Sequence, residues 1–230
     1  MRLLLLGYGR MGRLVESLAP QYGFEVAGWL DDTNNQDGAG LQAGRWSGVD
    51  VAIDFSTAAA VVTDVPALAR LGINVVIGTT GWQAHEADVR RAAAGIGVVA
   101  APNFSTGVVL FEALAEYAGR LLGAQDDFGA WVHEAHHAKK VDAPSGTALM
   151  LKTALARGGY ARPIDLSSTR AGSIPGTHTV GFDGPSETIT LTHTARDRAT
   201  FARGALQAAR WVQGRRGWFT MRDVLGLGHA

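Results

Sequence analysis

The stretch that decides the fold is RLLLLGYGRMG, residues 2–12, where an apolar run leads directly into the hexad G-x-G-x-x-G. The run predicts a buried strand, and the hexad predicts a tight turn that opens a helix. Gly7 permits the turn, Gly9 lets the backbone approach a pyrophosphate, and Gly12 lets the helix pack closely on the strand. The helix N-terminus then offers amide donors to a phosphate. We therefore interpret this stretch as the start of a Rossmann-type dinucleotide-binding domain.

A carboxylate at the end of the next apolar run supports this interpretation. Asp31 follows the predicted strand Phe24 to Leu30, where a carboxylate accepts hydrogen bonds from a ribose hydroxyl. A purely structural tight turn and a solvent-exposed acid would produce the same sequence pattern in a protein that binds no dinucleotide. The pair Asp31-Asp32 should repel a 2′-phosphate, which favours NAD over NADP, although Arg10 or Arg13 could reach across to that phosphate. Use of either dinucleotide therefore stays open.

The first part of the chain alternates apolar runs with alanine-rich segments that have polar faces. The predicted strands are Leu3 to Leu6, Phe24 to Leu30, Val49 to Phe55, Asn74 to Ile77 and Gly97 to Ala100. The predicted helices are Met11 to Leu18, Ala58 to Leu71 and Gln83 to Ala94. Near-continuous apolar strands that alternate with helices indicate a parallel sheet covered on both faces, the doubly wound α/β arrangement. Gly78 to Gly81 and Ala101 to Phe104 end two of these strands, at the sheet edge where ligands bind, although on their own residues either could equally be an ordinary connection.

The pattern changes after Asn103, which indicates a second domain of the α+β class. Its predicted elements are a helix over Thr106 to Leu122, a strand from Phe128 into a histidine-rich turn, a helix beginning near Ser145, and an alternating strand over Glu187 to Thr194. Beyond it, Ala199 to Val212 has helical spacing. The apolar tail Trp218 to Leu225 is expected to pack against the rest of the chain.

The letters HEAHH, residues 133–137, match the H-E-x-x-H pattern of zinc metalloproteases, which requires both histidines on one face of a helix. The residues before it mix glycine, aromatic and β-branched side chains, which predicts a strand, and Pro144 disfavours a helix downstream. In a strand His133 and His137 share one face while His136 takes the other. We therefore expect no metal site, and we expect His133 and Glu134 to be structural residues.

Composition favours small molecules as partners. The 230 residues carry 21 basic and 21 acidic side chains and no cysteine. The charge balance gives no general attraction to nucleic acid or to a membrane. The lack of cysteine excludes disulfides and thiolate metal sites and favours a cytoplasmic location. The opening apolar run is too short for a membrane span and lacks the features of a signal peptide.

The order of the motifs resembles the 4-hydroxy-tetrahydrodipicolinate reductase (dihydrodipicolinate reductase) family of lysine and diaminopimelate biosynthesis. The matching stretches are GYGRMG, VAIDFS, GTTGW, APNFSTGV, EAHHAKKVDAPSGTAL, RAGSIPGTHTV and MRDVLGL, which span nearly the whole chain. The resemblance implies a dinucleotide-binding domain over residues 1–104 and about 202–230. It also implies a substrate-binding and oligomerisation domain over about 105–201 that builds a homotetramer.

The resemblance further implies a reaction and a set of site residues. The reaction is the reduction of 4-hydroxy-tetrahydrodipicolinate to tetrahydrodipicolinate with NADH, NADPH or both. By position, His136 resembles the family's proton donor or acceptor, and Lys140 resembles its second catalytic residue. The implied substrate contacts are His137, Gly146, Thr147 and Thr80. The implied cofactor contacts are Gly7, Tyr8, Gly9, Arg10, Met11, Gly12, Asp31, Gly78, Thr79, Thr80, Ala101, Pro102, Asn103 and Phe104.

Physical reasoning agrees with these roles. A substrate with two carboxylates needs positive groups, which Lys140 and the free amides of the helix after Ser145 supply. Adding hydride to a C=C bond conjugated with C=N leaves negative charge that needs a proton, and histidine titrates in a useful range. The residues alone do not separate His136 from His137 as the proton donor.

Three other side chains have weaker predictions. Arg170 is expected either to counter a substrate carboxylate or to form a structural ion pair. His178 is expected to support the site, and His193 is expected to lie at the surface of its strand.

The residues also leave three rival functions open. They are a nicotinamide-binding redox regulator without catalysis, a zinc hydrolase, and a different Rossmann reductase.

Thr57 and Ala58 lack the basic residue that some family members carry after Asp-Phe-Ser, which leaves the preferred dinucleotide undecided.

Overall fold

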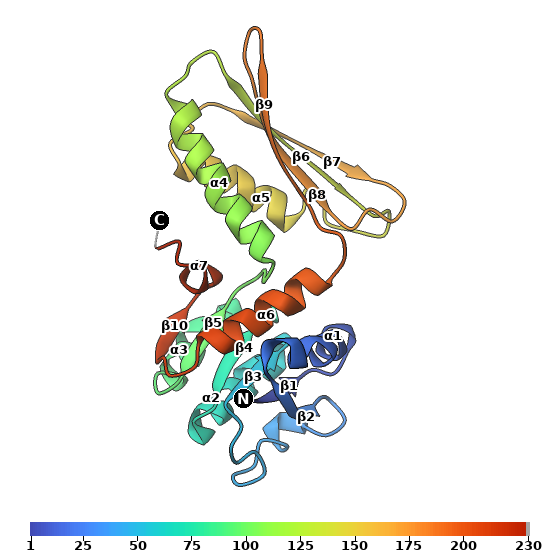
Figure 1. Cartoon of the computed structure of the whole chain (residues 1–230), viewed down its shortest axis with the longest axis vertical. Coiled ribbons are helices and arrows are strands. Elements are labelled where there is room, and N and C mark those ends of the chain that lie inside the picture. Colours follow the sequence, from blue (N-terminus) through green and yellow to red (C-terminus); the bar gives the residue numbers. More distant parts are fainter. Residues whose placement is uncertain (229–230) are drawn as a thin grey trace. The chain divides into compact units, whose positions relative to one another are not determined.

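The computed structural model describes residues 1–228 and divides the chain into two compact units (Figure 1). Unit 1 joins Met1–Thr106 to the segment from Ala199 onward, and unit 2 is Gly107–Arg198. These boundaries lie within a few residues of the predicted ones. Residues 229 and 230, which the prediction assigned to the first domain, lie outside the described residues.

The core of unit 1 is a parallel sheet of six strands in the order β10-β5-β4-β3-β1-β2. Its strands are β1 (Arg2–Leu6), β2 (Glu25–Leu30), β3 (Val51–Asp54), β4 (Asn74–Ile77), β5 (Gly97–Ala100) and β10 (Gly217–Phe219). The first five form where the apolar runs predict them, and in β1, β3, β4 and β5 nearly all side chains are buried, as expected for strands covered on both faces. The predicted doubly wound α/β class is therefore confirmed.

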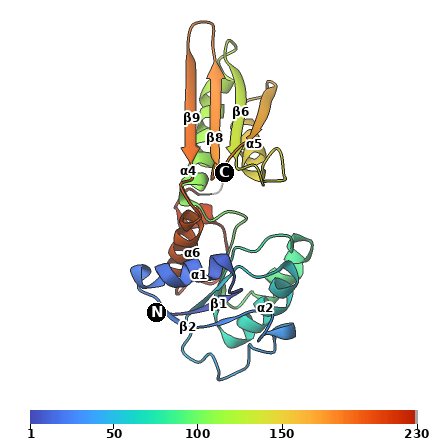
Figure 2. The same cartoon turned by 90° about the vertical axis from the view of Figure 1, so that its right-hand side faces the viewer.

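Helices cover both faces of this sheet. They are α1 (Arg10–Leu18), α2 (Ala58–Leu71), α3 (Glu86–Ala92), α6 (Ala199–Trp211) and α7 (Met221–Val224), with short 3-10 turns η1 (Ala19–Tyr22), η2 (Gln36–Gly38) and η3 (Gln83–His85). Leu4 and Leu6 pack with α2 side chains such as Val65. Leu3 and Leu5 alternate to the other face, on which α1 and α6 pack against each other (Figures 1 and 2).

The predicted helix over Gln83 to Ala94 is interrupted. The chain forms η3 first, and His85 then leaves helical geometry with φ −107° and ψ 8° before α3 begins at Glu86. Glu86 and Asp88 lie in the first turn of α3, where carboxylates complement the helix dipole.

Unit 2 is a mixed four-stranded sheet in the order β7-β6-β8-β9, with two helices on one face (Figure 1). Its elements are α4 (Thr106–Gly123), β6 (Gly129–His136), α5 (Gly146–Arg157), β7 (Ile164–Arg170), β8 (Thr177–Asp183) and β9 (Thr188–Thr194). Strands β7 and β8 were not predicted. Apolar residues of the sheet, such as Val132, Val180 and Phe182, pack with Phe111 of α4 and Leu151 of α5.

The opposite face of this sheet is rich in hydroxyl groups. Thr179 and Thr192 form a cross-strand hydrogen bond of 3.0 Å, and His133 Nδ1 lies 2.9 Å from Ser167 Oγ. Within residues 107–198, neither helix covers this face. Among the residues that the structure describes, no helix is both long and apolar enough to cross a membrane.

Candidate active site

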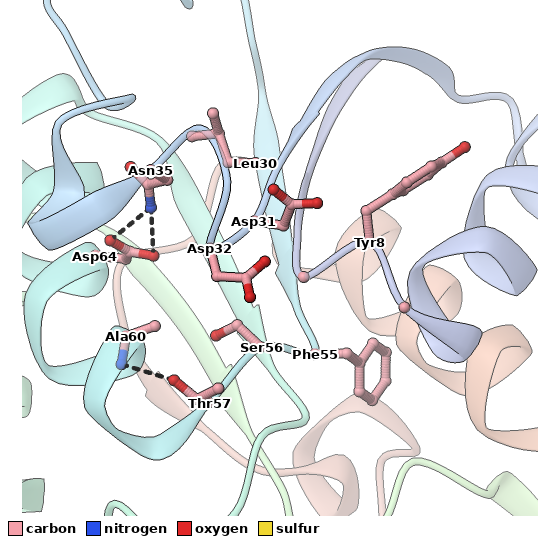
Figure 3. A pocket seen from close by; sticks show the side chains of 12 residues that line it. Tyr8, Leu30, Asp31, Asp32, Asn35, Phe55, Ser56, Thr57, Ala60 and Asp64 are labelled. Atoms are coloured by element: carbon pink, nitrogen blue, oxygen red, sulfur yellow. Dashed lines mark hydrogen bonds between the residues drawn. The ribbon is translucent and has the colours of Figure 1, made fainter.

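A cleft opens in unit 1 where the strand order reverses. The chain runs from β1 to β2 on one side and then crosses to β3 on the other, so the loops after β1 and β3 diverge. Such a switch point is where open α/β sheets bind ligands. A pocket of about 370 Å³ lies there (Figure 3). It is lined by Gly7, Tyr8, Gly9, Leu30, Asp31, Asp32, Asn35, Phe55, Ser56, Thr57, Ala60 and Asp64.

The glycine turn fits a pyrophosphate. Gly7 has φ +84°, and a Cβ there would lie 2.4 Å from the Phe55 carbonyl oxygen. A Cβ on Gly12 would lie 2.2 Å from the Gly7 carbonyl oxygen, so only glycine lets α1 approach the turn this closely. A Cβ on Gly9 would meet nothing within 4 Å, which leaves space for a ligand beside its backbone. No side chain caps the first amides of α1, so they remain available to a phosphate.

Two carboxylates line this pocket at the end of β2. Asp31 accepts hydrogen bonds from Thr33 Oγ1 at 2.6 Å and Thr33 N at 3.0 Å. These bonds lower the pKa of Asp31, which keeps it ionised and able to accept hydrogen bonds. Asp32 lines the same pocket. Beside them the Tyr8 ring stacks on Trp29 with centroids 4.6 Å apart.

The remaining predicted cofactor residues occupy the same edge of the sheet without lining this pocket. Arg10, Met11 and Gly12 form the first turn of α1, Gly78 to Thr80 follow β4, and Ala101 to Phe104 follow β5. Buried Asp54 at the end of β3 joins the loop after β3 to the loop after β4, because its Oδ1 accepts from Ser56 Oγ and Thr79 Oγ1, both at 2.7 Å. Thr80 is exposed, whereas Phe104 is buried edge-on against Phe55.

Asp64 makes the stability of unit 1 depend on pH. It is 2% exposed, both of its oxygens accept from Asn35 Nδ2 at 3.0 Å (Figure 3), and burial raises its pKa to about 6. The folded state therefore holds this proton more tightly than the unfolded state, where an aspartate titrates near pH 4. The free energy of unfolding should fall as the pH rises from about 4 to about 6. In Asp64→Asn that fall should shrink, and the variant should gain up to about 3 kcal/mol at pH 8.

The measurement is urea unfolding at pH 4.5 and pH 8, followed by tryptophan fluorescence. Five of the six tryptophans lie in unit 1, so the signal reports mainly that unit. Asp88→Asn, which removes an exposed carboxylate paired with Arg91, is the control. An unchanged pH dependence in Asp64→Asn would contradict the assignment.

The inner face of the unit 2 sheet becomes polar at one end. The strand register aligns Ser168, Glu134, His178 and His193 across β7, β6, β8 and β9, and we call these four residues the polar row. Arg170 pairs with His136 one step further along. The N-terminus of α5 joins the row, because Ser145 caps that helix and its Oγ lies 3.2 Å from His178 Nε2.

Glu134 and His136 form a buried carboxylate–imidazole pair. They are two residues apart on β6, so they share one face, and His136 Nδ1 donates to Glu134 Oε2. Glu134 Oε1 accepts from Arg170 Nη2 at 2.6 Å and from Ser145 N at 3.3 Å. Burial alone would raise the pKa of Glu134, but the hydrogen bonds from Arg170, Ser168 and His136 outweigh it and lower that pKa to about 2.

Burial also governs the two histidines. It lowers the pKa of His136, and nearby Lys140 and Arg170 lower it further, whereas Glu134 opposes them. Burial lowers the pKa of His178 to about 4. His178 is therefore a neutral neighbour of His136 near pH 7, with the two ring centroids 5.0 Å apart.

The residues do not fit a resident metal ion. Glu134, His136 and His178 have donor atoms within 4.8 Å of one another. However, Arg170 and Ser145 occupy one oxygen of Glu134, and His136 occupies the other. The H-E-x-x-H letters do not form the helical site that zinc requires, because β6 runs through His136 and places His133 on the face opposite Glu134.

The other predicted residues of unit 2 lie in the loop after β6 and at the start of α5. Lys140 Nζ donates to both carboxylate oxygens of Asp142, at 2.7 and 2.9 Å. His137 follows the end of β6, and Gly146 and Thr147 begin α5. A Cβ on Gly146 would meet nothing within 4 Å, so the backbone there is open to a ligand. Thr80 belongs to unit 1 and is not part of this cluster.

Two weaker predictions are resolved or corrected. Of the two possibilities for Arg170, the structure shows the ion pair, with Glu134. The expectation that His193 lies at the surface was wrong, because its ring stacks on Phe111 at 6.0 Å and its Nδ1 is buried. Position 193 faces the helices, since it continues the polar row.

Sequence reasoning missed the role of Glu134. The zinc pattern drew attention to Glu134 as a general base, and rejecting that pattern left it as a structural residue. The signal that could have found it is the spacing Glu134-x-His136 in a strand, which puts a carboxylate and an imidazole side by side.

Together, the glycine turn beside a pocket-lining carboxylate and the buried carboxylate–imidazole pair of unit 2 are typical of a two-domain dinucleotide-dependent oxidoreductase. The family model for the N-terminus of dihydrodipicolinate reductase matches residues 1–104, and the model for its C-terminus matches residues 107–225. The chain belongs to the dihydrodipicolinate reductase family, which reduces its substrate with NADH or NADPH.

Individual relatives agree with this assignment. The chain is 40% identical to the 4-hydroxy-tetrahydrodipicolinate reductase of Laribacter hongkongensis, over 99% of this chain and 98% of the relative. It is 42% identical to that of Thiobacillus denitrificans, over 95% and 96%. The expectation of an NAD(P)H-dependent oxidoreductase is confirmed, and the regulator and the zinc hydrolase are not favoured.

Solved structures share the fold. A dipicolinate-bound dihydrodipicolinate reductase from Paenisporosarcina sp. TG-14 matches with a TM-score of 0.80 at 22% identity, over 97% of this chain and 98% of that one. An amine dehydrogenase from Mycobacterium smegmatis matches with a TM-score of 0.58 at 12% identity, over 97% and 95%.

Proposed function

We propose that this chain reduces 4-hydroxy-tetrahydrodipicolinate to tetrahydrodipicolinate, with His136 as the proton donor and Lys140 as the second catalytic residue. The observation that carries this proposal is the buried Glu134–His136 pair beside a lysine and the open N-terminus of α5. Overall the substrate loses water and gains a hydride and a proton. NADH or NADPH, when bound, supplies the hydride.

Unit 1 would hold the dinucleotide through the residues predicted for it. The amides of Gly9 to Met11 lie at the start of α1 and would bind the pyrophosphate. Asp31 would accept from the ribose hydroxyls. The loops at Gly78 to Thr80 and Ala101 to Phe104 would complete the site along the same sheet edge.

Unit 2 would hold the two carboxylates of the substrate. The Lys140 ammonium group has three N–H donors, and Asp142 does not accept from all of them. A substrate carboxylate can therefore bind the same ammonium group. The other carboxylate would bind the amides of Gly146 and Thr147, which the α5 dipole favours. His137 would add a contact beside them. His136 would then protonate the carbon that becomes electron-rich once hydride has been added.

The test is the oxidation of cofactor at 340 nm with enzymatically generated substrate, run in parallel with NADH and NADPH. Both cofactors should be oxidised only when substrate is present, and kcat/KM should be higher with NADH. Asp31 and Asp32 line the ribose pocket, and their charges oppose a 2′-phosphate. Absence of oxidation with both cofactors would refute the proposed function, whereas a preference for NADPH would refute only the role of the two aspartates.

The proposal includes a homotetramer in the cytoplasm. The hydroxyl-rich sheet face of unit 2 supports self-association, because neither α4 nor α5 of residues 107–198 covers it. Dependence on NADH or NADPH, which are kept inside cells, supports the location. Native mass spectrometry at micromolar concentration gives the number of chains directly.

A further inference from the structure

We propose that Glu134 is a positioning residue that fixes the ring orientation and tautomer of His136, and that Arg170 holds Glu134 in place for this task. The inference rests on the proposed role of His136 as the proton donor. It assigns a function to a carboxylate that the substrate itself would not contact.

The Glu134 carboxylate is immobilised by its hydrogen bonds. Its side chain is fully buried, and each oxygen has a separate task. Oε1 accepts from Arg170 Nη2 and Ser145 N, and Oε2 accepts from His136 Nδ1. Arg170 is itself fixed, because the same Nη2 donates to the Asp142 carbonyl oxygen at 2.6 Å. A carboxylate held from β7 and α5 can orient a ring better than a mobile one.

The hydrogen bond to Glu134 leaves one nitrogen of the His136 ring free. Because Nδ1 donates to Glu134, Nε2 is the nitrogen left to exchange a proton with substrate. The chain keeps space beside this atom, since a Cβ on Gly176 would lie only 3.0 Å from His136 Nε2. The ring of His178 contacts His136 edge-on and adds no charge near pH 7. Nε2 is therefore the nitrogen that this arrangement leaves available for proton exchange with the substrate.

Charged groups on several elements surround the His136 imidazole. His136 faces Glu134 on its own strand, Arg170 on β7, His178 on β8, and Lys140 in the loop after β6. Burial and the two cations lower the pKa of His136, and only Glu134 raises it. Without the Glu134 charge, fewer imidazoles carry the second proton at neutral pH. The turnover number should then decline at a lower pH, because a general acid works only while protonated.

The test is Glu134→Gln in the full-length chain. We expect kcat at pH 7.5 to fall roughly 10- to 100-fold, less than for loss of the proton donor itself. The alkaline limb of the kcat profile should move down by about one to two pH units, as expected for removal of an adjacent opposite charge. The KM for the dinucleotide should stay constant, because its predicted contacts lie outside this cluster. Glu112→Gln, which removes a different carboxylate of unit 2 paired with Arg157, should leave the profile unchanged.

A double variant separates positioning from a purely structural role. In a His136→Ala background, Glu134→Gln should change kcat less than about twofold, because the two groups act as one unit. An undiminished effect in that background, or an unshifted pH profile in the single variant, would overturn the inference.

The wild-type protein offers a test that needs no variant of Glu134. ¹⁵N NMR of the imidazoles, with the His136 signals assigned by their loss in His136→Ala, should show Nδ1 protonated and Nε2 unprotonated in the neutral ring. The opposite tautomer would overturn the inference even if Glu134→Gln fails to fold. Failure of the wild-type assay would refute the proposed function, whereas an active wild type with the wrong tautomer would refute only the positioning role.

Discussion

Replacing His136 by alanine is expected to lower kcat by roughly 100- to 10,000-fold, the range that general acid catalysis contributes. The reason is geometric as well as chemical. His136 is the histidine that bonds a buried carboxylate while its other nitrogen faces the gap left by Gly176. Dinucleotide affinity should not change, since the predicted cofactor residues all lie in unit 1. The measurement is steady-state turnover together with fluorescence titration of NADH.

Two further histidine variants make this result interpretable. His85→Ala removes an exposed histidine of unit 1 and should keep wild-type turnover. His137→Ala should raise the KM for substrate more than it lowers kcat, because we propose that His137 binds substrate. If His137→Ala lost turnover and His136→Ala retained it, the two roles would have to be exchanged.

Replacing Gly12 by alanine is expected to abolish measurable dinucleotide binding and to destabilise unit 1 by about 2 to 4 kcal/mol. The added methyl group would lie 2.2 Å from the carbonyl oxygen of Gly7. That oxygen belongs to the backbone of the glycine turn and cannot rotate away as a flexible side chain could. Helix α1 must therefore shift, and its first amides would move with it. Calorimetric titration with NADH and urea unfolding measure the two effects.

Two other glycines provide matched comparisons. A Cβ on Gly95 would meet nothing within 4 Å, so Gly95→Ala should bind NADH normally and unfold at the wild-type urea concentration. Gly9 is equally open in the protein itself, so Gly9→Ala should fold normally and yet bind NADH weakly, because the pyrophosphate needs that space. Wild-type binding in both Gly9→Ala and Gly12→Ala would contradict the proposed pyrophosphate site.

The sheet of unit 1 could be predicted because most of its strands consist of apolar residues. Strands such as β1 and β3 are buried on both faces, so their sequences read as unbroken apolar runs between glycine and alanine-rich segments. The short strand β10 was missed, because Gly217 to Phe219 is too brief to show a period and its place at the sheet edge depends on pairing with β5.

The second sheet was harder to predict, and its polar residues explain why. In β7 the positions that face the helices include Ser168 and Arg170, which pair with Glu134 and His136 of β6. The alternation of apolar and polar residues is therefore lost at the end of the strand that lies beside these two residues. The motif residues His136 and Lys140 could be proposed from the resemblance alone. The hydrogen bond from His136 to Glu134, and the hold of Arg170 on that glutamate, required the register of β6 against β7.

Unit 1 consists of two sequence segments that flank unit 2, and this affects the order of folding during synthesis. A ribosome releases residues in order, so unit 2, which is the continuous segment Gly107–Arg198, emerges complete before α6 and β10 emerge. Until then the sheet of unit 1 lacks its edge strand β10, and the face on which α6 packs against α1 is uncovered. Domains generally fold as units during synthesis. The nascent chain should therefore fold unit 2 first and complete unit 1 last, and a chain truncated after unit 2 should expose apolar surface that chaperones bind.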